Sequence, residues 1–202
     1  MVGIATIFII ISATLVLLFF TLHLIKRNDL RHKKQLETMN DIANRNPLTG
    51  VNNHRAFILS ERRILASLAE NPLHRYGIVI CGVNDLKYVN DRFDHDYGDE
   101  YLRKACQMIC RVYKMSPVFR IGGDEFAVIL EGEDFENREA LQKELNSKSL
   151  ANTETDDGIV IAVGTATNKY KEGFQDVFRR ADKQMYSHKS ALKKKRPSHN
   201  LR

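Results

Sequence analysis

Two short apolar runs flank a pair of adjacent glycines in this 202-residue chain, and this feature constrains the fold most. The runs, residues 118–121 and 125–130, are rich in β-branched and aromatic residues, which is typical of strands. Gly122 and Gly123 lie between them and predict a tight turn, so the chain contains an antiparallel hairpin. A further β-branched run at residues 76–83 predicts a buried strand.

The segments around these strands carry apolar residues three or four positions apart, which is the pattern of amphipathic helices. Another strand is predicted at residues 158–166. The predicted helices are residues 55–69, 84–93, 98–114, 136–145 and 174–189. Strands and helices in this order predict an α/β domain whose sheet is antiparallel at the hairpin and is covered by helices.

The start of the chain is strongly apolar. Residues 2–25 carry no charged side chain, and basic residues follow directly from Lys26. A helix of that length rises about 36 Å, and a hydrocarbon core is about 30 Å thick. The positive-inside rule then predicts a single-pass anchor at residues 1–25 in the cytoplasmic membrane, with the amino terminus outside and the remainder in the cytoplasm. A cleaved signal peptide is the alternative, but its flanking features are absent.

Positive charge is concentrated near the two ends of the remaining chain. Residues 26–45 are predicted to form a polar helical linker with one heptad of apolar residues, which is weak evidence for a short coiled coil. A basic tail follows the domain at residues 193–202. The net charge is +6, and the charged ends account for more than this, so the stretch between them is slightly acidic. Domains that bind nucleic acid are basic over their folded surface, so no nucleic-acid partner is expected.

The three cysteines form neither a disulfide framework nor a zinc motif. Cys106 and Cys110 are four residues apart and share one face of a helix. We expect them to be small buried hydrophobic residues in a reducing compartment, because a metal pair would need further ligands.

Two acidic residues, Asp124 and Glu125, directly follow the glycines of the hairpin. Glycine lets a backbone approach a ligand closely because it has no Cβ atom. Adjacent carboxylates are suitable ligands for hard cations such as Mg²⁺. An acidic turn that merely faces water is the alternative, and the composition of the turn leaves both possibilities open.

The stretch Gly122–Phe126 spells GGDEF, the motif that gives the GGDEF family of diguanylate cyclases its name, and further segments resemble family motifs in the family order. These segments are NPLTGVNN at 46–53, VNDLKYVND at 83–91, FDHDYGD at 93–99 and ADKQMYSHK at 181–189. The resemblance covers roughly residues 44–195 and implies a GGDEF domain at residues 46–192 with the palm-like fold of nucleotidyl cyclases. It also implies a homodimer in which each domain holds one GTP and the two GTP are condensed to cyclic di-GMP and pyrophosphate.

The resemblance implies a role for each matching residue. Asp124 corresponds to the metal-binding carboxylate and Glu125 to the catalytic acid beside it, with the backbone carbonyl of Val83 as a further metal contact. Mg²⁺ or Mn²⁺ is the implied cofactor. The residues implied to bind substrate are Asn90 and Asp99 at the guanine edge, Lys87 and Lys189 at the phosphates, and Gly122 and Gly123 along the nucleotide.

Several positions depart from the family pattern. Gly82 stands where the family has a metal-binding aspartate. Loss of even an outer partner of a metal ligand costs about 10–100-fold, so slow catalysis is expected. Asn46 replaces another aspartate and is expected to remove a partner of Arg120. Residues 113–116 lack the RxxD product-inhibition motif.

Three functions follow from these departures. The first is a membrane-anchored diguanylate cyclase of low activity. The second is a degenerate module that binds GTP or a partner without turnover. The third is a scaffold whose anchor and linker drive dimerisation.

Overall fold

The computed structural model describes residues 2–154 and 158–195, and the side chains of residues 3, 17–153 and 158–195. The chain divides into two units, residues 1–43 and 44–202. Helix α1 (Val2–Asn44) makes up the first unit, and the remaining elements belong to the second. The part of the predicted basic tail at 196–202 lies outside the described residues.

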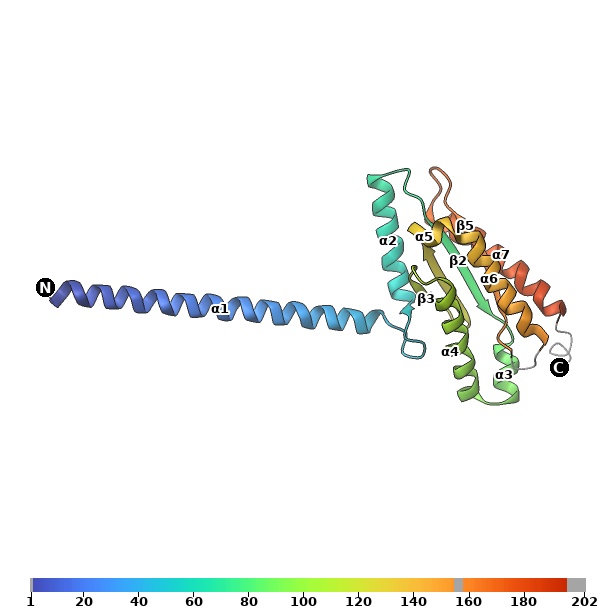
Figure 1. Ribbon diagram of the computed structural model, residues 1–202, viewed down its shortest axis with the longest axis horizontal. Helices are drawn as coiled ribbons and strands as arrows, with labels where there is room; N and C mark the ends of the chain where they lie inside the picture. The colour runs from blue at the N-terminus through green and yellow to red at the C-terminus, as the bar shows by residue number, and fades with distance from the viewer. Residues whose placement is uncertain (1, 155–157, 196–202) are drawn as a thin grey trace. The chain divides into compact units, whose positions relative to one another are not determined.

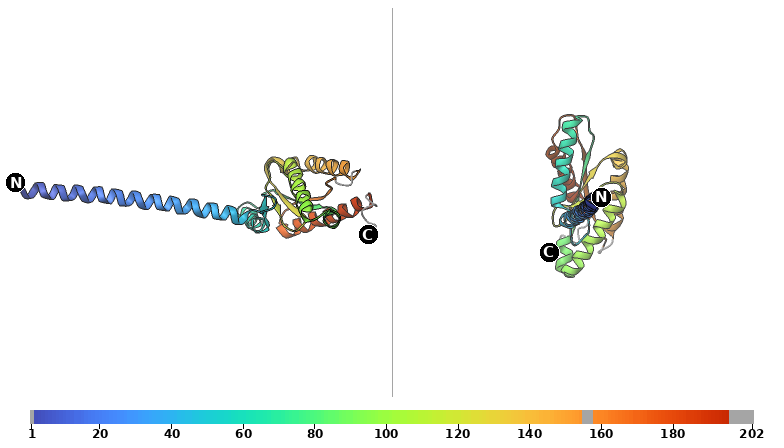
Figure 2. Two further views of the ribbon diagram at one scale, coloured as in Figure 1. Left: turned by 90° about the horizontal axis from the view of Figure 1, so that it is seen from below. Right: turned by 90° about the vertical axis from the view of Figure 1, so that its left-hand side faces the viewer.

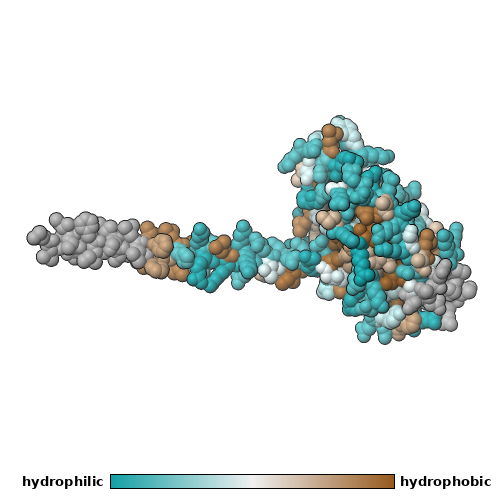
Figure 3. Space-filling model, viewed as in Figure 1, coloured by the Kyte–Doolittle hydropathy of each residue, from teal (hydrophilic) through white to brown (hydrophobic). Residues whose placement is uncertain are grey.

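Helix α1 corrects the prediction of a membrane anchor. Its described apolar side chains at the amino-terminal end run from Leu17 to Ile25, after which charged residues follow, and Figure 3 shows this change from brown to teal. Within the part of the chain that the structure describes, no helix is long and apolar enough to cross a membrane.

The prediction of a transmembrane helix at residues 1–25, and of a location in the cytoplasmic membrane, is therefore wrong. Residue 1 and the side chains of residues 2 and 4–16, on which most of that prediction rested, lie outside the described residues.

The second unit contains a five-stranded mixed sheet with the strand order β1-β3-β4-β2-β5 (Figure 1). The strands are β1 (Asn52–Asn53), β2 (Gly77–Val83), β3 (Val118–Arg120), β4 (Glu125–Leu130) and β5 (Ile161–Thr167). β2 pairs antiparallel with both β4 and β5, and β3 pairs antiparallel with β4. β1 pairs parallel with β3. The predicted hairpin is thus β3–β4, and it lies beside the predicted buried strand β2.

Helices cover both faces of this sheet. They are α2 (His54–Glu70), α3 (Leu86–Arg92), α4 (His95–Val112), α5 (Gly132–Glu136), α6 (Arg138–Ala151) and α7 (Phe174–Lys195), with a short 3₁₀ turn η1 (Asn152–Glu154). Figure 2 shows α6 (orange) and α7 (red) on opposite sides of the strands. Side chains alternate along a strand, so β2 supplies Val79 to the core under α4 and α6, and Ile78 and Ile80 to the core under α2 and α7.

The predicted α/β architecture, with an antiparallel hairpin covered by helices, is confirmed by these elements. All seven residues of β2 are buried, which explains why its sequence is continuously apolar. Three of the described elements have no predicted counterpart, β1, α5 and η1. They are two, five and three residues long, and such short segments carry no recognisable periodicity.

The outer edge of β5 is covered by side chains in place of another strand. Three consecutive outward N–H groups of β5 each donate to a side-chain acceptor. The Ile161 N–H donates to Ser149 Oγ at 3.1 Å, the Val163 N–H to His188 Nδ1 at 3.0 Å, and the Thr165 N–H to Gln184 Oε1 at 3.3 Å. An uncovered edge is a template for pairing with other chains, so these bonds from α6 and α7 protect it.

Candidate functional site

The turn of the β3–β4 hairpin is held by Arg120. Its Nη2 and Nε atoms donate to the carbonyl oxygen of Gly123 at 2.7 and 3.2 Å. Its Nη1 atom donates to Asn46 Oδ1 at 3.4 Å, and the same oxygen accepts from the N–H and hydroxyl of Thr49 at 3.1 and 3.0 Å. The expectation that Asn46 removes a partner of Arg120 is therefore wrong, because the amide oxygen accepts in place of a carboxylate.

The two glycines of the turn have different surroundings. A Cβ atom on Gly122 would lie 3.0 Å from Glu125 Oε2, so the Glu125 side chain folds over that glycine. A Cβ atom on Gly123 would meet no atom within 4 Å. The turn is therefore open beside Gly123 and closed by Glu125 beside Gly122.

Asp124 and Lys189 form an ion pair at the base of the hairpin, with Nζ 2.8 Å from Oδ2. Their side chains are 36% and 21% exposed. The N–H of Val83 donates to the main-chain oxygen of Asp124 at 2.8 Å, which joins the end of β2 to the turn. The fold thus brings together three predicted site residues from β2, the hairpin and α7.

Gly82, the altered position, lies in the interior of the sheet. It pairs with Glu125 of β4 on one side and with Ala162 of β5 on the other. A Cβ atom on Gly82 would lie 2.8 Å from Met185 Sδ and 3.6 Å from Lys189 Nζ. The space that a side chain at this position would need is thus filled from α7 by a buried thioether and an ammonium group.

Met185 is a site residue that the sequence did not indicate. It lies in the ADKQMYSHK segment, where it reads as one apolar position of an amphipathic helix. Nothing in its local pattern shows that it packs against Gly82, because the two residues are distant in sequence.

Asn90 is in direct contact with Gly98, the residue that precedes Asp99 in α4. A Cβ atom on Gly98 would lie 1.7 Å from Asn90 Oδ1, so the Asn90 side chain occupies the space that the glycine leaves. This oxygen is buried and has no hydrogen-bond partner among the described residues. An unpaired buried acceptor costs about 1–3 kcal/mol, and an N–H group of a ligand would relieve that cost. Asp94 caps α4 by accepting from the Tyr97 N–H at 2.7 Å.

Lys87 lies in the first turn of α3 and is exposed. Within residues 17–153 and 158–195, the structure shows no ion pair of Lys87 with a predicted site residue. Its role at a phosphate stays a prediction.

The described residues contain no group of three or more His, Cys, Asp or Glu side chains close enough to hold a metal ion. Asp124, Glu125 and the Val83 carbonyl remain as oxygen donors near the hairpin. Mg²⁺ is usually bound by one or two carboxylates together with substrate phosphates and water. The donor set therefore fits a hard divalent cation that arrives with a nucleotide, and does not fit a cage built by protein ligands alone.

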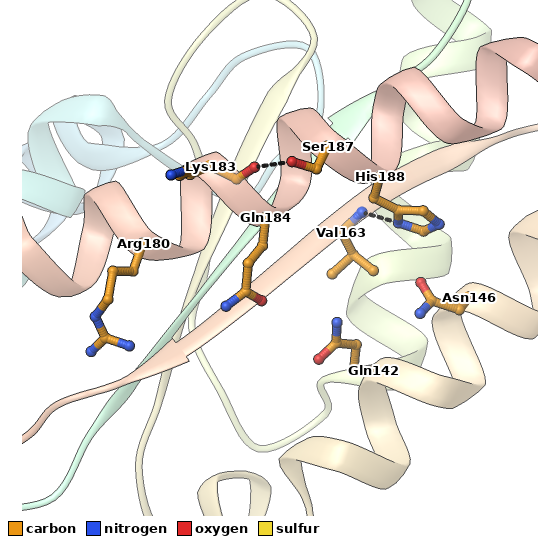
Figure 4. A pocket seen from close by; sticks show the side chains of 8 residues that line it. All are labelled: Gln142, Asn146, Val163, Arg180, Lys183, Gln184, Ser187 and His188. Atoms are coloured by element: carbon orange, nitrogen blue, oxygen red, sulfur yellow. Dashed lines mark hydrogen bonds between the residues drawn. The ribbon is translucent and has the colours of Figure 1, made fainter.

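A separate polar groove of about 490 Å³ lies between α6 and α7 over the edge of β5 (Figure 4). It is lined by Gln142, Asn146, Val163, Arg180, Lys183, Gln184, Ser187 and His188. None of the predicted site residues is among them. Gln184 and His188 are engaged with the β5 backbone, so this groove belongs to the covering of the sheet edge.

The cysteines behave as expected for small core residues, with one qualification. Cys81 and Cys106 are buried and Cys110 is half-buried, and all three are free thiols. Burial raises the pKa of Cys81 above its usual range, whereas a hydrogen bond from Cys106 lowers the pKa of Cys110 to about 7.

Comparison with known proteins agrees with the motifs. The family described as diguanylate cyclase, GGDEF domain, matches residues 43–195. The chain is 27% identical over 168 residues to the probable diguanylate cyclase DgcT of Escherichia coli, which covers 79% of this chain and 36% of DgcT. It is 31% identical over 84 residues to the uncharacterized protein YhcK of Bacillus subtilis, which covers 41% of this chain and 23% of YhcK. The chain thus spans well under half the length of these two relatives.

Solved structures share the fold. The coiled coil and GGDEF domain of DgcB from Caulobacter crescentus, in complex with c-di-GMP, has a TM-score of 0.67 at 26% identity, covering 82% of this chain and 91% of that chain. The diguanylate cyclase SiaD of Pseudomonas aeruginosa, in complex with its activator SiaC, has a TM-score of 0.65 at 19% identity, covering 90% and 73%. The second likeness concerns the fold alone.

The expected nucleotidyl cyclase fold is confirmed by these neighbours together with the mixed five-stranded sheet. From the GGDEF hairpin, the fold around it and the match over residues 43–195, we conclude that this chain belongs to the GGDEF-domain family of diguanylate cyclases.

Proposed function

We propose that this chain binds GTP at the β3–β4 hairpin and that two chains together condense two GTP molecules to cyclic di-GMP and pyrophosphate at a low rate. The observation that supports this most is the Asp124–Lys189 pair beside the end of β2. It combines a ligand for a cation with a donor for a phosphate, taken from separate motifs of the family. A domain that only joins proteins needs neither group.

Asn90 and Asp99 would recognise the guanine base. Guanine carries N–H groups on its N1 and N2 atoms, whereas adenine has no proton on N1. The unpaired Oδ1 of Asn90 can accept one such N–H, and the Asp99 carboxylate can accept another. A wrong base would leave the buried Asn90 acceptor and the half-buried Asp99 carboxylate unpaired, which is the physical basis of strong discrimination between bases.

The reaction joins the 3′-hydroxyl of one GTP to the α-phosphorus of the other and releases pyrophosphate. Positioning and electrostatics carry most of the catalysis in phosphoryl transfer. A bound Mg²⁺ or Mn²⁺ would neutralise charge on the phosphates. Asp124 would hold that cation, and Glu125, folded over Gly122, would accept the hydroxyl proton. An ammonium has three donors, so Lys189 can bind a phosphate oxygen while it keeps its bond to Asp124.

The low rate follows from Gly82. A carboxylate at this position would add negative charge beside the cation, and water cannot supply that charge. Loss of an outer partner of a metal ligand already costs about 10–100-fold, so loss of a direct ligand should cost at least as much.

A second function, GTP binding without turnover, is favoured by one specific observation. Met185 Sδ lies 2.8 Å from the Cβ position of Gly82, so the site is packed as though a side chain at position 82 were never needed. Under this alternative, the domain would act as a GTP-dependent partner for another protein.

The two functions are separated by incubating the full chain with GTP and Mg²⁺ or Mn²⁺ and measuring cyclic di-GMP by chromatography. We expect slow product formation that Glu125→Gln abolishes. Gly82→Asp combined with Met185→Ala should be faster than wild type by about an order of magnitude or more, because it restores a metal ligand and the room for it. Gly82→Asp alone should gain less, and Met185→Ala is the matched control.

A ligand that binds only the folded state raises the melting temperature, so thermal unfolding reports binding independently of turnover. No product together with a GTP-dependent rise in melting temperature selects binding without turnover. Neither product nor a rise would reject both functions.

A further inference from the structure

The ammonium group of Lys189 occupies the space between Gly82 and Asp124. Its Nζ atom lies 2.8 Å from Asp124 Oδ2 and 3.6 Å from the position of a Cβ atom on Gly82. A carboxylate on residue 82 would begin within ion-pair reach of the same ammonium. In this chain glycine takes that place, so Asp124 is the carboxylate that shares the charge of Lys189.

Met185 and Lys189 approach Gly82 from the same side. The two residues are four apart on α7 and therefore lie on the same face of the helix. Met185 is 3% exposed and packs in the core between α7 and the sheet, with its sulfur beside Gly82. The thioether thus fills the space beside Gly82, and the Lys189 side chain, 21% exposed, reaches Asp124.

Carboxylates at both positions 82 and 124 would attract more divalent cations than this site can, because it has a glycine at position 82. The acidic side chains at the hairpin are Asp124 and Glu125, and Lys189 already balances one of them. Two divalent cations beside a triphosphate would need ligands that the described residues do not assemble, since no group of three acidic, His or Cys side chains is present among them.

We infer that Lys189 is a built-in counter-ion of this site and that GTP binds here with one divalent cation per chain instead of two. This inference rests on the proposed function, because it concerns the same nucleotide site. Lys189 donates one N–H to Asp124 and would donate another to a phosphate oxygen of bound GTP, so its positive charge would replace that of a further cation. It acts as a positioning residue for the triphosphate.

The test counts bound Mn²⁺ by electron paramagnetic resonance, in which hydrated Mn²⁺ gives the signal and bound Mn²⁺ loses it. The full chain, saturated with a non-hydrolysable GTP analogue and freed of excess analogue, is titrated with Mn²⁺, and a titration of the analogue alone shows how much Mn²⁺ the nucleotide binds without the chain. We expect one Mn²⁺ per chain in wild type, and two in the variant Gly82→Asp combined with Met185→Ala. Two Mn²⁺ per chain in wild type would overturn the inference and leave the proposed function intact.

A second variant keeps the test informative if the double variant does not fold. Lys189→Met removes the charge and frees Asp124, so Mn²⁺ should bind the nucleotide-free chain more tightly by roughly tenfold, as expected for the loss of one adjacent charge. Lys183→Met is the matched control, because Lys183 is an exposed lysine on the same helix outside the site. Unchanged Mn²⁺ affinity in Lys189→Met would overturn the inference.

Failure of the proposed function has a different signature. Suppose that, in the presence of the GTP analogue, the chain binds no Mn²⁺ and its melting temperature does not rise. The proposed nucleotide site is then wrong, and the inference fails with it.

Discussion

At Gly82 and Gly98, the space that a Cβ atom would need is occupied by the side chain of another residue. The space beside Gly98 is taken by the amide oxygen of Asn90, and the space beside Gly82 is taken by the sulfur of Met185. The first contact places an unpaired acceptor against Gly98, and the second fills the space that a side chain at position 82 would need. Substitution of either glycine therefore tests the residue that packs on it.

Gly98→Ala should displace Asn90, because the new Cβ atom would lie 1.7 Å from Asn90 Oδ1. Overpacking costs about 1–3 kcal/mol, against about 1 kcal/mol gained when alanine replaces glycine inside a helix. We expect a net loss of stability in urea unfolding and a loss of the GTP-dependent rise in melting temperature.

The control is to introduce Gly98→Ala into Asn90→Ala, where no side-chain oxygen is in the way. There the same change should stabilise the chain by about 0.5–1 kcal/mol through helix propensity. Equal effects of Gly98→Ala in the two backgrounds would contradict the contact between Asn90 and Gly98.

Among the elements, helix α7 serves both the sheet edge and the site. Gln184 and His188, four residues apart, accept hydrogen bonds from β5. Figure 4 shows the bond from Val163 to His188. Met185 and Lys189, the next residues in sequence, face Gly82 and Asp124. The two pairs lie side by side along one helix. The bonds to β5 therefore fix the position of α7 along its axis, and its rotation about that axis, at the site.

The bond to His188 makes stability depend on pH. Burial lowers the pKa of His188 below its usual value of 6.5, and the nearby Lys195 lowers it further. The unfolded chain thus binds more protons below pH 6.5 than the folded chain, so stability is full above that pH and falls as the pH decreases. One proton gives a slope of at most about 1.4 kcal/mol per pH unit.

His188→Asn should flatten this slope, since the amide oxygen accepts the Val163 N–H without titrating. The measurement is the free energy of urea unfolding at a series of pH values from about 5 to about 8, on both sides of the usual pKa of histidine. His95→Asn, at an exposed position of α4, is the control and should keep the wild-type slope. If His188→Asn and wild type show the same slope, His188 does not bind β5 as a neutral acceptor.

On the scale of the whole molecule, the folded domain has a core of its own. The residues of both apolar clusters lie between Leu48 and Leu192. In α1, the apolar side chains Leu36, Met39 and Ile42 are more than half exposed in a single chain. Pairing of two chains through residues 26–45 would cover them, and this remains a prediction.

Removal of residues 1–43 should leave the domain folded, because the described core draws on no residue before Leu48. We expect the melting temperature of residues 44–202 to differ from that of the full chain by less than about 4 °C, equivalent to about 1 kcal/mol. Circular dichroism measures this. An unfolded fragment would show that α1 contributes to the domain.

The same fragment tests dimerisation. If residues 26–45 pair two chains, the fragment should sediment as a monomer at concentrations where the full chain is a dimer, and its specific activity should fall. Equal sedimentation behaviour of the two proteins would place the dimer contact in the domain itself.

All strands except β1, the long helices, the hairpin and the family could be predicted from the sequence. Each of these depends on residues that are close together in the chain, such as the alternation around Gly122 and Gly123 or the order of four short motifs. The same local reading was wrong for residues 1–25, where counting apolar residues predicted an anchor that no described helix supports. It was also wrong for Asn46, because a side-chain type does not reveal which donor it will meet.

The tertiary structure alone decided what stands at the altered position and which atoms face it. Met185 over Gly82, Lys189 on Asp124, and Asn90 on Gly98 are contacts between side chains that the fold brings within a few ångströms. Volume, charge and hydrogen bonding at a site depend on these distances, whereas local sequence patterns depend on neighbours along the chain. The family can therefore be recognised in the sequence, but the packing that sets this member apart is visible only after folding.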